Sequence, residues 1–83
     1  MKMEEKIQQK LESAFVPQTL VVINESHLHR GHAGDDGSGE SHFRVEIAAT
    51  CFDSVNRVQR ERMVHAALAE EIPLIHALSI KIL

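Results

Sequence analysis

The residues best suited to chemistry in this chain are histidines, and most of them lie in one glycine-rich stretch. His27, His29 and His32 fall within residues 24–43, which also contain all four glycines. Neutral imidazole binds zinc, copper, nickel and iron, so this cluster is a candidate metal site. Its spacing matches neither the histidine pair of a metalloprotease helix nor a zinc finger. A solvated polar loop with clustered histidines therefore stays open as the alternative.

The histidine-rich stretch lies between two segments that have the composition of β-strands. Residues 19–24 form a β-branched run, and residues 42–52 alternate apolar and polar side chains. An antiparallel pair joined by a flexible loop over residues 26–41 is the simplest arrangement. So long a loop is uncommon in a small chain unless it has a function, because ordering it costs conformational entropy. The pattern thus favours a functional loop that projects from one end of a sheet.

The segment before the first strand has the period of an amphipathic helix. Apolar side chains recur there at every fourth position, at Met3, Ile7, Leu11 and Phe15. They form one stripe that can pack on a sheet. Pro17 ends this helix, because proline lacks an amide hydrogen and clashes with the preceding turn.

A second helix and a third strand follow residues 42–52. The helix is expected to begin within residues 53–59, where N-capping side chains gather, and to run to about Glu71 with a break before its end. Pro73 prevents its continuation. Residues 74–83 again alternate apolar and polar side chains, which indicates a third strand.

These elements predict an α+β fold, one small domain over residues 1–83 with the order α-β-β-α-β. Because a helix links the second strand to the third, those two strands can pair in parallel. The first two strands are joined directly and pair antiparallel. The expected architecture is a mixed three-stranded sheet with both helices on one face.

Composition excludes several classes of protein. The chain has 83 residues, a net charge of −3 and one cysteine. No apolar run approaches the roughly 20 residues needed to cross a bilayer, and a lone cysteine fits the reducing cytoplasm. The acidic balance argues against strong nonspecific attraction to nucleic acid. No nucleophile stands beside a base at a spacing that supports catalysis, so we expect a protein that is not an enzyme.

Three side chains outside the loop carry specific expectations. Arg60 shares the apolar stripe of the second helix, and a buried arginine needs a partner. We therefore expect an ion pair with a loop carboxylate such as Glu25 or Glu40. Docking of glutathione by Arg60 or Arg62 is the alternative role. Cys51 has the parity of the buried face of its strand and is expected to be a packing residue. His42 has the opposite parity, so we expect it on the wet face of the strand as a solvated residue or as a member of a hydrogen-bond network.

Several motifs together resemble the BolA family. They occur in the order and close to the spacing of that family, and they span nearly the whole chain. The matching segments are residues 24–26, 39–45, 60–65, 68–71 and 75–78.

The resemblance implies a fold related to the class II KH domain and a function as a partner protein. BolA-like proteins pair with monothiol glutaredoxins that carry a Cys-Gly-Phe-Ser motif. The two proteins share a [2Fe-2S] cluster, to which glutathione contributes a thiolate, in iron-sulfur maturation, trafficking or iron sensing. The resemblance implies no cofactor bound tightly by the isolated chain.

The resemblance also implies the cluster ligands on this chain. A histidine near the start of the last strand matches His76, and the loop ligand matches His32. The loop is slightly longer than is usual in the family, so His29 and His27 stay open as alternates. Imidazole ligands in place of thiolates reduce the negative charge of a cluster and raise its potential, as in Rieske centres.

Two other functions stay open. A nucleic-acid-binding transcriptional or stress-morphology regulator would use Arg57, Arg60 and Arg62 of the second helix to contact phosphates, with DNA as the partner. Simple zinc binding or metal storage is the other. For the oligomeric state we expect a monomer or a weak homodimer, with the dimer formed through sheet residues such as Val22 and Ala48, and through Thr50.

Overall fold

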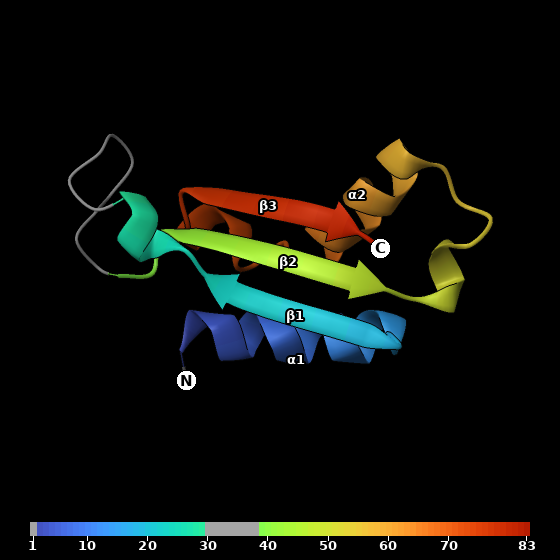
Figure 1. Ribbon diagram of the computed structural model, residues 1–83, viewed down its shortest axis with the longest axis horizontal. Helices are drawn as coiled ribbons and strands as arrows, with labels where there is room; N and C mark the ends of the chain where they lie inside the picture. Colours follow the sequence, from blue (N-terminus) through green and yellow to red (C-terminus); the bar gives the residue numbers. More distant parts are fainter. Residues whose placement is uncertain (1, 30–38) are drawn as a thin grey trace.

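The computed structural model describes residues 2–29 and 39–83 of the chain, with the backbone alone for Leu28 and His29. Regular structure alternates between helices and strands from one end to the other (Figure 1). The elements are α1 (Met3–Phe15), β1 (Thr19–Asn24), η1 (Ser26–His29), β2 (His42–Ala48), η2 (Thr50–Phe52), α2 (Arg57–Ala67), η3 (Ile72–Leu74) and β3 (Ala77–Ile82), where η marks a short 3₁₀ helix.

The sheet has three strands in the order β1-β2-β3. The central strand β2 pairs antiparallel with β1 and parallel with β3, so that Val45 lies between Val22 and Ile80. The segment containing α2 is therefore the crossover that parallel pairing requires. This arrangement confirms the mixed sheet and the α-β-β-α-β order that the sequence predicts.

Both helices cover the same face of the sheet. The fully buried residues Ile7 and Leu11 of α1 and Val64 of α2 belong to one core cluster with Val45 and Ile47 of β2. Alternate residues of β2 point to this core, as the two-residue period of a strand requires. The other face carries half-buried and exposed side chains, except for the buried His42 at the start of β2, and neither α1 nor α2 packs on it.

The uncovered face differs from the one the sequence suggests for a dimer. Val22 packs against the core, whereas its neighbours Val21 and Ile23 are the exposed apolar residues of β1. Thr50 lies in the η2 turn and so contributes nothing to the sheet surface. Val22 therefore faces the core, whereas a dimer contact through Val22 requires it to face outward.

The end of β2 corrects another expectation. The strand stops at Ala48, four residues before the predicted end, and η2 follows at once. Strand alternation no longer holds in a 3₁₀ turn, so Phe52 is buried and Cys51 is exposed. The prediction that Cys51 packs inside the molecule is wrong.

The second helix begins where the sequence places it and ends earlier. The side chain of Asn56 caps α2 by accepting a hydrogen bond from the Gln59 N–H at 2.9 Å. The helix ends at Ala67 instead of near Glu71, and the following turns position Leu68 fully inside the core. Residues 69–76 therefore form turns and η3, and β3 starts three residues later than predicted.

Candidate functional site

His76 lies directly before β3, at the end of the sheet where residues 24–43 leave and re-enter it. Its side chain is exposed, while its backbone N–H donates a hydrogen bond of 2.8 Å to the carbonyl oxygen of Ser41. The N–H of Ala77 donates to the same oxygen at 3.1 Å. His76 is thus held beside the first residue of β2, which follows the predicted loop. Figure 1 shows η1 and the start of β2 together at this end of the sheet.

Ser26 joins the two ends of the stretch that the sequence predicts to be a loop. Its Oγ accepts hydrogen bonds from the N–H of Ser41 at 2.9 Å and from the N–H of His42 at 3.1 Å. The same hydroxyl lies 3.4 Å from the carbonyl oxygen of His42, to which it donates. Since Ser26 and Ser41 are both buried, these backbone N–H groups depend on the hydroxyl for a partner.

Asn24 adds a second connection between the same two ends. Its Nδ2 donates to the carbonyl oxygen of Gly39 at 2.7 Å, and its Oδ1 accepts from the N–H of Ser26 at 2.9 Å. The latter bond forms an Asx turn, a geometry that asparagine side chains favour at the end of a strand. We call the hydrogen bonds among Asn24, Ser26, Ser41 and His42 the loop-base network.

His42 is buried and belongs to this network, so it is a network residue and not the solvated residue that was the other expectation. Its side chain is on the face of the sheet that no helix covers, but its exposed fraction is 6%. Its Nδ1 lies 2.7 Å from Ser41 Oγ, and its ring centroid lies 5.1 Å from that of His76 at an interplanar angle of 47°. The ring is on the face that strand alternation would leave exposed, but His76 and η1 lie against this end of β2.

The loop histidines are only partly described. His27 is exposed in η1, and the backbone of His29 ends the same turn. His32, the ligand that the resemblance favours, lies outside the described residues. Within residues 2–29 and 39–83, no group of three or more metal-binding side chains gathers in one place. The choice among the three loop histidines therefore stays a prediction.

Sequence reasoning did not single out Ser26 and Ser41, although a signal for them exists. Small polar residues flank both sides of the histidine stretch, in Asn24-Glu25-Ser26 and in Gly39-Glu40-Ser41. Such residues favour hydrogen bonds to nearby backbone groups at the ends of strands. The pairing of the two flanks across the sheet is a tertiary contact that neither flank reveals by itself.

The three arginines named by the sequence do not share one surface. Arg57 and Arg60 line a hollow of about 360 Å³ beside β3, together with Lys81 and the acidic Glu61. Arg62 is not among its lining residues. Arg60 donates from Nε to the carbonyl oxygen of Val55 at 2.6 Å. The expected ion pair with Glu25 or Glu40 is therefore wrong.

The ion pair of Arg60 with Glu25 or Glu40 does not form because of the direction in which the chain runs. The start of α2 follows the end of β2 that is remote from the loop, so Arg60 is too far from the loop-base carboxylates. Glu40 instead accepts a hydrogen bond of 3.2 Å from the backbone N–H of Met3, where α1 begins.

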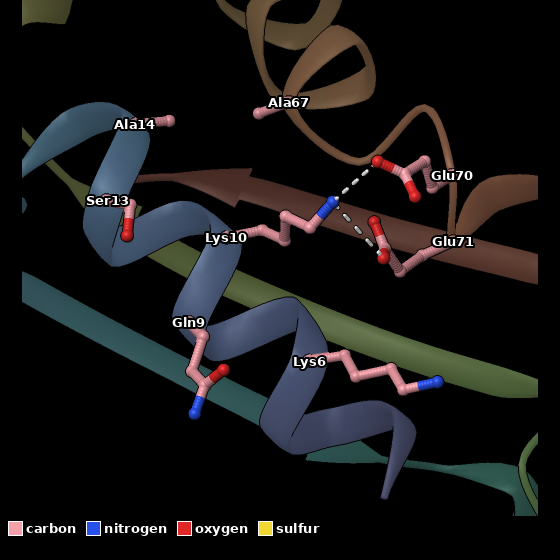
Figure 2. A pocket seen from close by; sticks show the side chains of 8 residues that line it. All are labelled: Lys6, Gln9, Lys10, Ser13, Ala14, Ala67, Glu70 and Glu71. Atoms are coloured by element: carbon pink, nitrogen blue, oxygen red, sulfur yellow. Dashed lines mark hydrogen bonds and ion pairs between the residues drawn. The ribbon is translucent and has the colours of Figure 1, made fainter. Parts of the chain in front are cut away.

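A larger groove of about 670 Å³ lies between α1 and the segment that follows α2 (Figure 2). Lys10 Nζ lies in it, 3.1 Å from a carboxylate oxygen of Glu70 and 3.6 Å from one of Glu71. The hydrogen bond with Glu70 raises the pKa of Lys10 above its ordinary value of 10.5. Small side chains on both helices, Ala14 and Ala67, leave the groove open.

The fold and the site together define the class of protein. A mixed three-stranded sheet with two helices on one face is the class II KH-like form of the α+β class, and the structure of BolA1 from Arabidopsis thaliana matches it. That structure superimposes with a TM-score of 0.83 at 38% identity, over 95% of this chain and 87% of its own.

Comparison of the sequence gives the family. Residues 11–83 match the family model described as BolA-like protein. The chain is 47% identical over 79 residues to BolA-like protein 1 of Homo sapiens, covering 94% of this chain and 55% of that protein. It is 38% identical over 81 residues to the DNA-binding transcriptional regulator BolA of Escherichia coli K12, covering 96% of this chain and 73% of that protein.

This chain therefore belongs to the BolA family. It spans about half the length of the human relative. Among the described residues, no helix is long and apolar enough to cross a membrane.

Proposed function

We propose that this chain is a non-enzymatic, cytoplasmic partner of a monothiol glutaredoxin and supplies histidine ligands to a shared [2Fe-2S] cluster. The ligands on this chain are His76 and a loop histidine, with His32 preferred and His29 and His27 as alternates. The glutaredoxin cysteine and glutathione provide the remaining ligands. The role of the complex is iron-sulfur cluster maturation or trafficking, or iron sensing.

The observation that carries this proposal is the position of His76 beside the base of the histidine-rich stretch. The exposed imidazole stands next to residues whose backbone is held by buried hydrogen bonds, through the 2.8 Å bond from His76 N–H to Ser41. Histidine is the donor type that replaces thiolate on an iron of Rieske centres. The donor chemistry at this end of the sheet therefore fits a cluster whose other ligands come from a partner.

A titration with all components of the complex tests the proposal. Wild type is mixed with a glutaredoxin bearing the Cys-Gly-Phe-Ser motif, glutathione, ferrous iron and sulfide, and visible absorption and circular dichroism are recorded. We expect a spectrum that differs from that of the glutaredoxin homodimer. His76→Ala should abolish or alter this spectrum, and His32→Ala should alter it if His32 is the loop ligand.

His65→Ala is the matched control, because His65 is exposed on α2. It should reproduce the wild-type spectrum. If wild type leaves the homodimer spectrum unchanged, the cluster proposal fails. His76→Ala should also unfold at nearly the same denaturant concentration as wild type, since substitutions of exposed side chains shift stability by less than about 0.5 kcal/mol.

A nucleic-acid-binding function is the second candidate, and the hollow beside β3 supports it. Arg57, Arg60 and Lys81 place three cationic side chains around this hollow, against one acidic side chain, that of Glu61. The named function of the Escherichia coli relative is DNA binding. Binding through phosphate contacts should weaken steeply as salt rises. The test is a duplex titration at low and high salt with wild type and Arg57→Gln, with Arg62→Gln as the control outside the hollow. Absence of binding at micromolar duplex in low salt contradicts this candidate.

A further inference from the structure

His42 is held in place by hydrogen bonds of its backbone and of its ring. Its N–H donates to Ser26 Oγ at 3.1 Å, and its carbonyl oxygen accepts from the N–H of Glu25 at 2.8 Å. The ring is anchored at Nδ1 by Ser41 Oγ, at 2.7 Å. A ring that is 6% exposed and bonded in this way has one orientation in the folded protein.

His76 has the opposite character. Its side chain is exposed and precedes the regular part of β3, and exposed side chains change rotamer within picoseconds to nanoseconds unless something holds them. The ring contact of His76 within the described residues is with His42, at a centroid distance of 5.1 Å and an angle of 47°. Tilted ring pairs at 4.5–7 Å are favourable.

Ser41 couples the two histidines through the backbone as well. Its carbonyl oxygen accepts hydrogen bonds from the N–H groups of His76 and Ala77, at 2.8 and 3.1 Å. Its hydroxyl anchors the His42 ring. A single buried residue therefore determines where the backbone of His76 lies and how the ring next to it is turned.

We propose that His42 is a positioning residue whose anchored ring holds the His76 imidazole in the orientation needed for ligation. This inference rests on the proposed role of His76 as a cluster ligand. Metal-binding histidines depend on neighbouring groups that orient them, and loss of such a neighbour weakens metal sites by about 10-fold to 100-fold. His42 differs from the usual case because it acts through ring packing, and Ser41 keeps it in place.

The first test uses the isolated protein and needs no cluster. Three-bond couplings measured by nuclear magnetic resonance report the χ1 rotamer of His76 in wild type, His42→Ala, His42→Phe and the control His65→Ala. We expect one dominant rotamer in wild type, in His42→Phe and in the control. His42→Ala should show averaged couplings at His76. The His42→Phe variant keeps an aromatic ring, slightly larger than imidazole, and loses the hydrogen bond to Ser41 Oγ. It therefore tests ring packing separately from the anchor, and it stays informative if His42→Ala folds poorly.

Two outcomes of this test overturn the proposal. Wild-type couplings at His76 in a folded His42→Ala variant would show that the ring contact orients nothing. Averaged couplings in a folded His42→Phe variant would show that ring packing is insufficient.

The second test measures the lifetime of the shared cluster by the decay of its circular dichroism. His42→Ala should shorten the half-life about tenfold, whereas His42→Phe should stay within about twofold of wild type. An unchanged half-life in His42→Ala overturns the proposal. If wild type forms no shared cluster at all, the proposed function fails, while the couplings still decide whether His42 orients His76.

Discussion

The loop-base network and the groove around Lys10, between α1 and the segment that follows α2, are two polar clusters. Their bond lengths are similar and their exposure to water differs. The Ser41 N–H lies 2.9 Å from Ser26 Oγ, and Lys10 Nζ lies 3.1 Å from Glu70. Ser41 is fully buried, whereas the Glu70 side chain is 84% exposed. Water can replace the partner of an exposed charge but not that of a buried N–H. The comparison indicates that burial, more than charge, decides how strongly each cluster holds the fold.

Glu71 lines the same groove as Glu70, but its side chain is buried. Its side chain is 7% exposed, and its Lys10 partner is 3.6 Å away. The other carboxylate oxygen, Oε1, is buried with no hydrogen-bond partner among the described residues. Burial removes most of the hydration of this carboxylate, and one weak ion pair offsets only a small part of that free-energy cost. The groove therefore combines an exposed pair of small effect with a buried acid that relies on Lys10.

The largest expected effect comes from Ser26→Ala. The substitution leaves the buried N–H groups of Ser41 and His42 without their acceptor, so we expect the free energy of unfolding to fall by about 2–3 kcal/mol. Urea denaturation measures it. Ser13→Ala, an exposed position that lines the groove, is the control and should change stability by less than about 0.5 kcal/mol. Equal effects of the two substitutions would contradict the assigned importance of the loop-base network.

Lys10→Met should lower the free energy of unfolding by less than Ser26→Ala does. A second substitution shows which carboxylate is responsible for the loss. Removing the ammonium leaves the buried Glu71 carboxylate without its ion pair. We therefore expect the Lys10→Met/Glu71→Gln double variant to be more stable than Lys10→Met alone in the same denaturation experiment. Lys10→Met/Glu70→Gln is the matched control, and it should show no such recovery, because Glu70 is solvated. Recovery of equal size in both double variants would contradict the distinction between the two acids.

The smallest effect is the pH dependence of the Lys10 contribution. Its hydrogen bond with Glu70 raises the pKa of Lys10 in the folded protein above 10.5, so the folded state holds this proton more tightly. The stabilisation is fully present below the unfolded pKa and is lost as pH rises through the folded pKa. The stability difference between wild type and Lys10→Met should therefore shrink from about pH 8 to about pH 12. A difference that grows over this range would contradict the assignment.

Periodic segments of the sequence predict the fold well. The four-residue repeat of α1 and the alternation in residues 43–47 locate the helix and the buried face of the central strand, because these patterns arise from local geometry. The order of elements also predicts the mixed sheet, since a helix must connect the parallel pair. Family membership, inferred from motifs spread over the chain, is confirmed by the matching family model.

Predictions failed where a residue's surroundings come from a distant part of the chain. Cys51 is exposed because β2 gives way to a turn, and Arg60 bonds to Val55 because α2 starts far from the loop. His42 has the parity of a solvated residue, yet His76 lies against its ring. For Arg60 and His42 periodicity describes the element correctly and says nothing of what packs on it. For Cys51 the alternation continues in the sequence beyond the point where the strand ends.

The sequence by itself determined the element order, the buried stripes of α1 and of the central strand, and the histidines available for ligation. Those properties depend on residue types and on short-range spacing. Tertiary structure alone decided that His76, His42 and Ser41 meet at one end of the sheet, because parallel pairing of β2 with β3 joins residues 35 positions apart in the chain. It also decided that the Ser26 hydroxyl, ordinary in the sequence, joins the two ends of the histidine-rich stretch next to the proposed ligand.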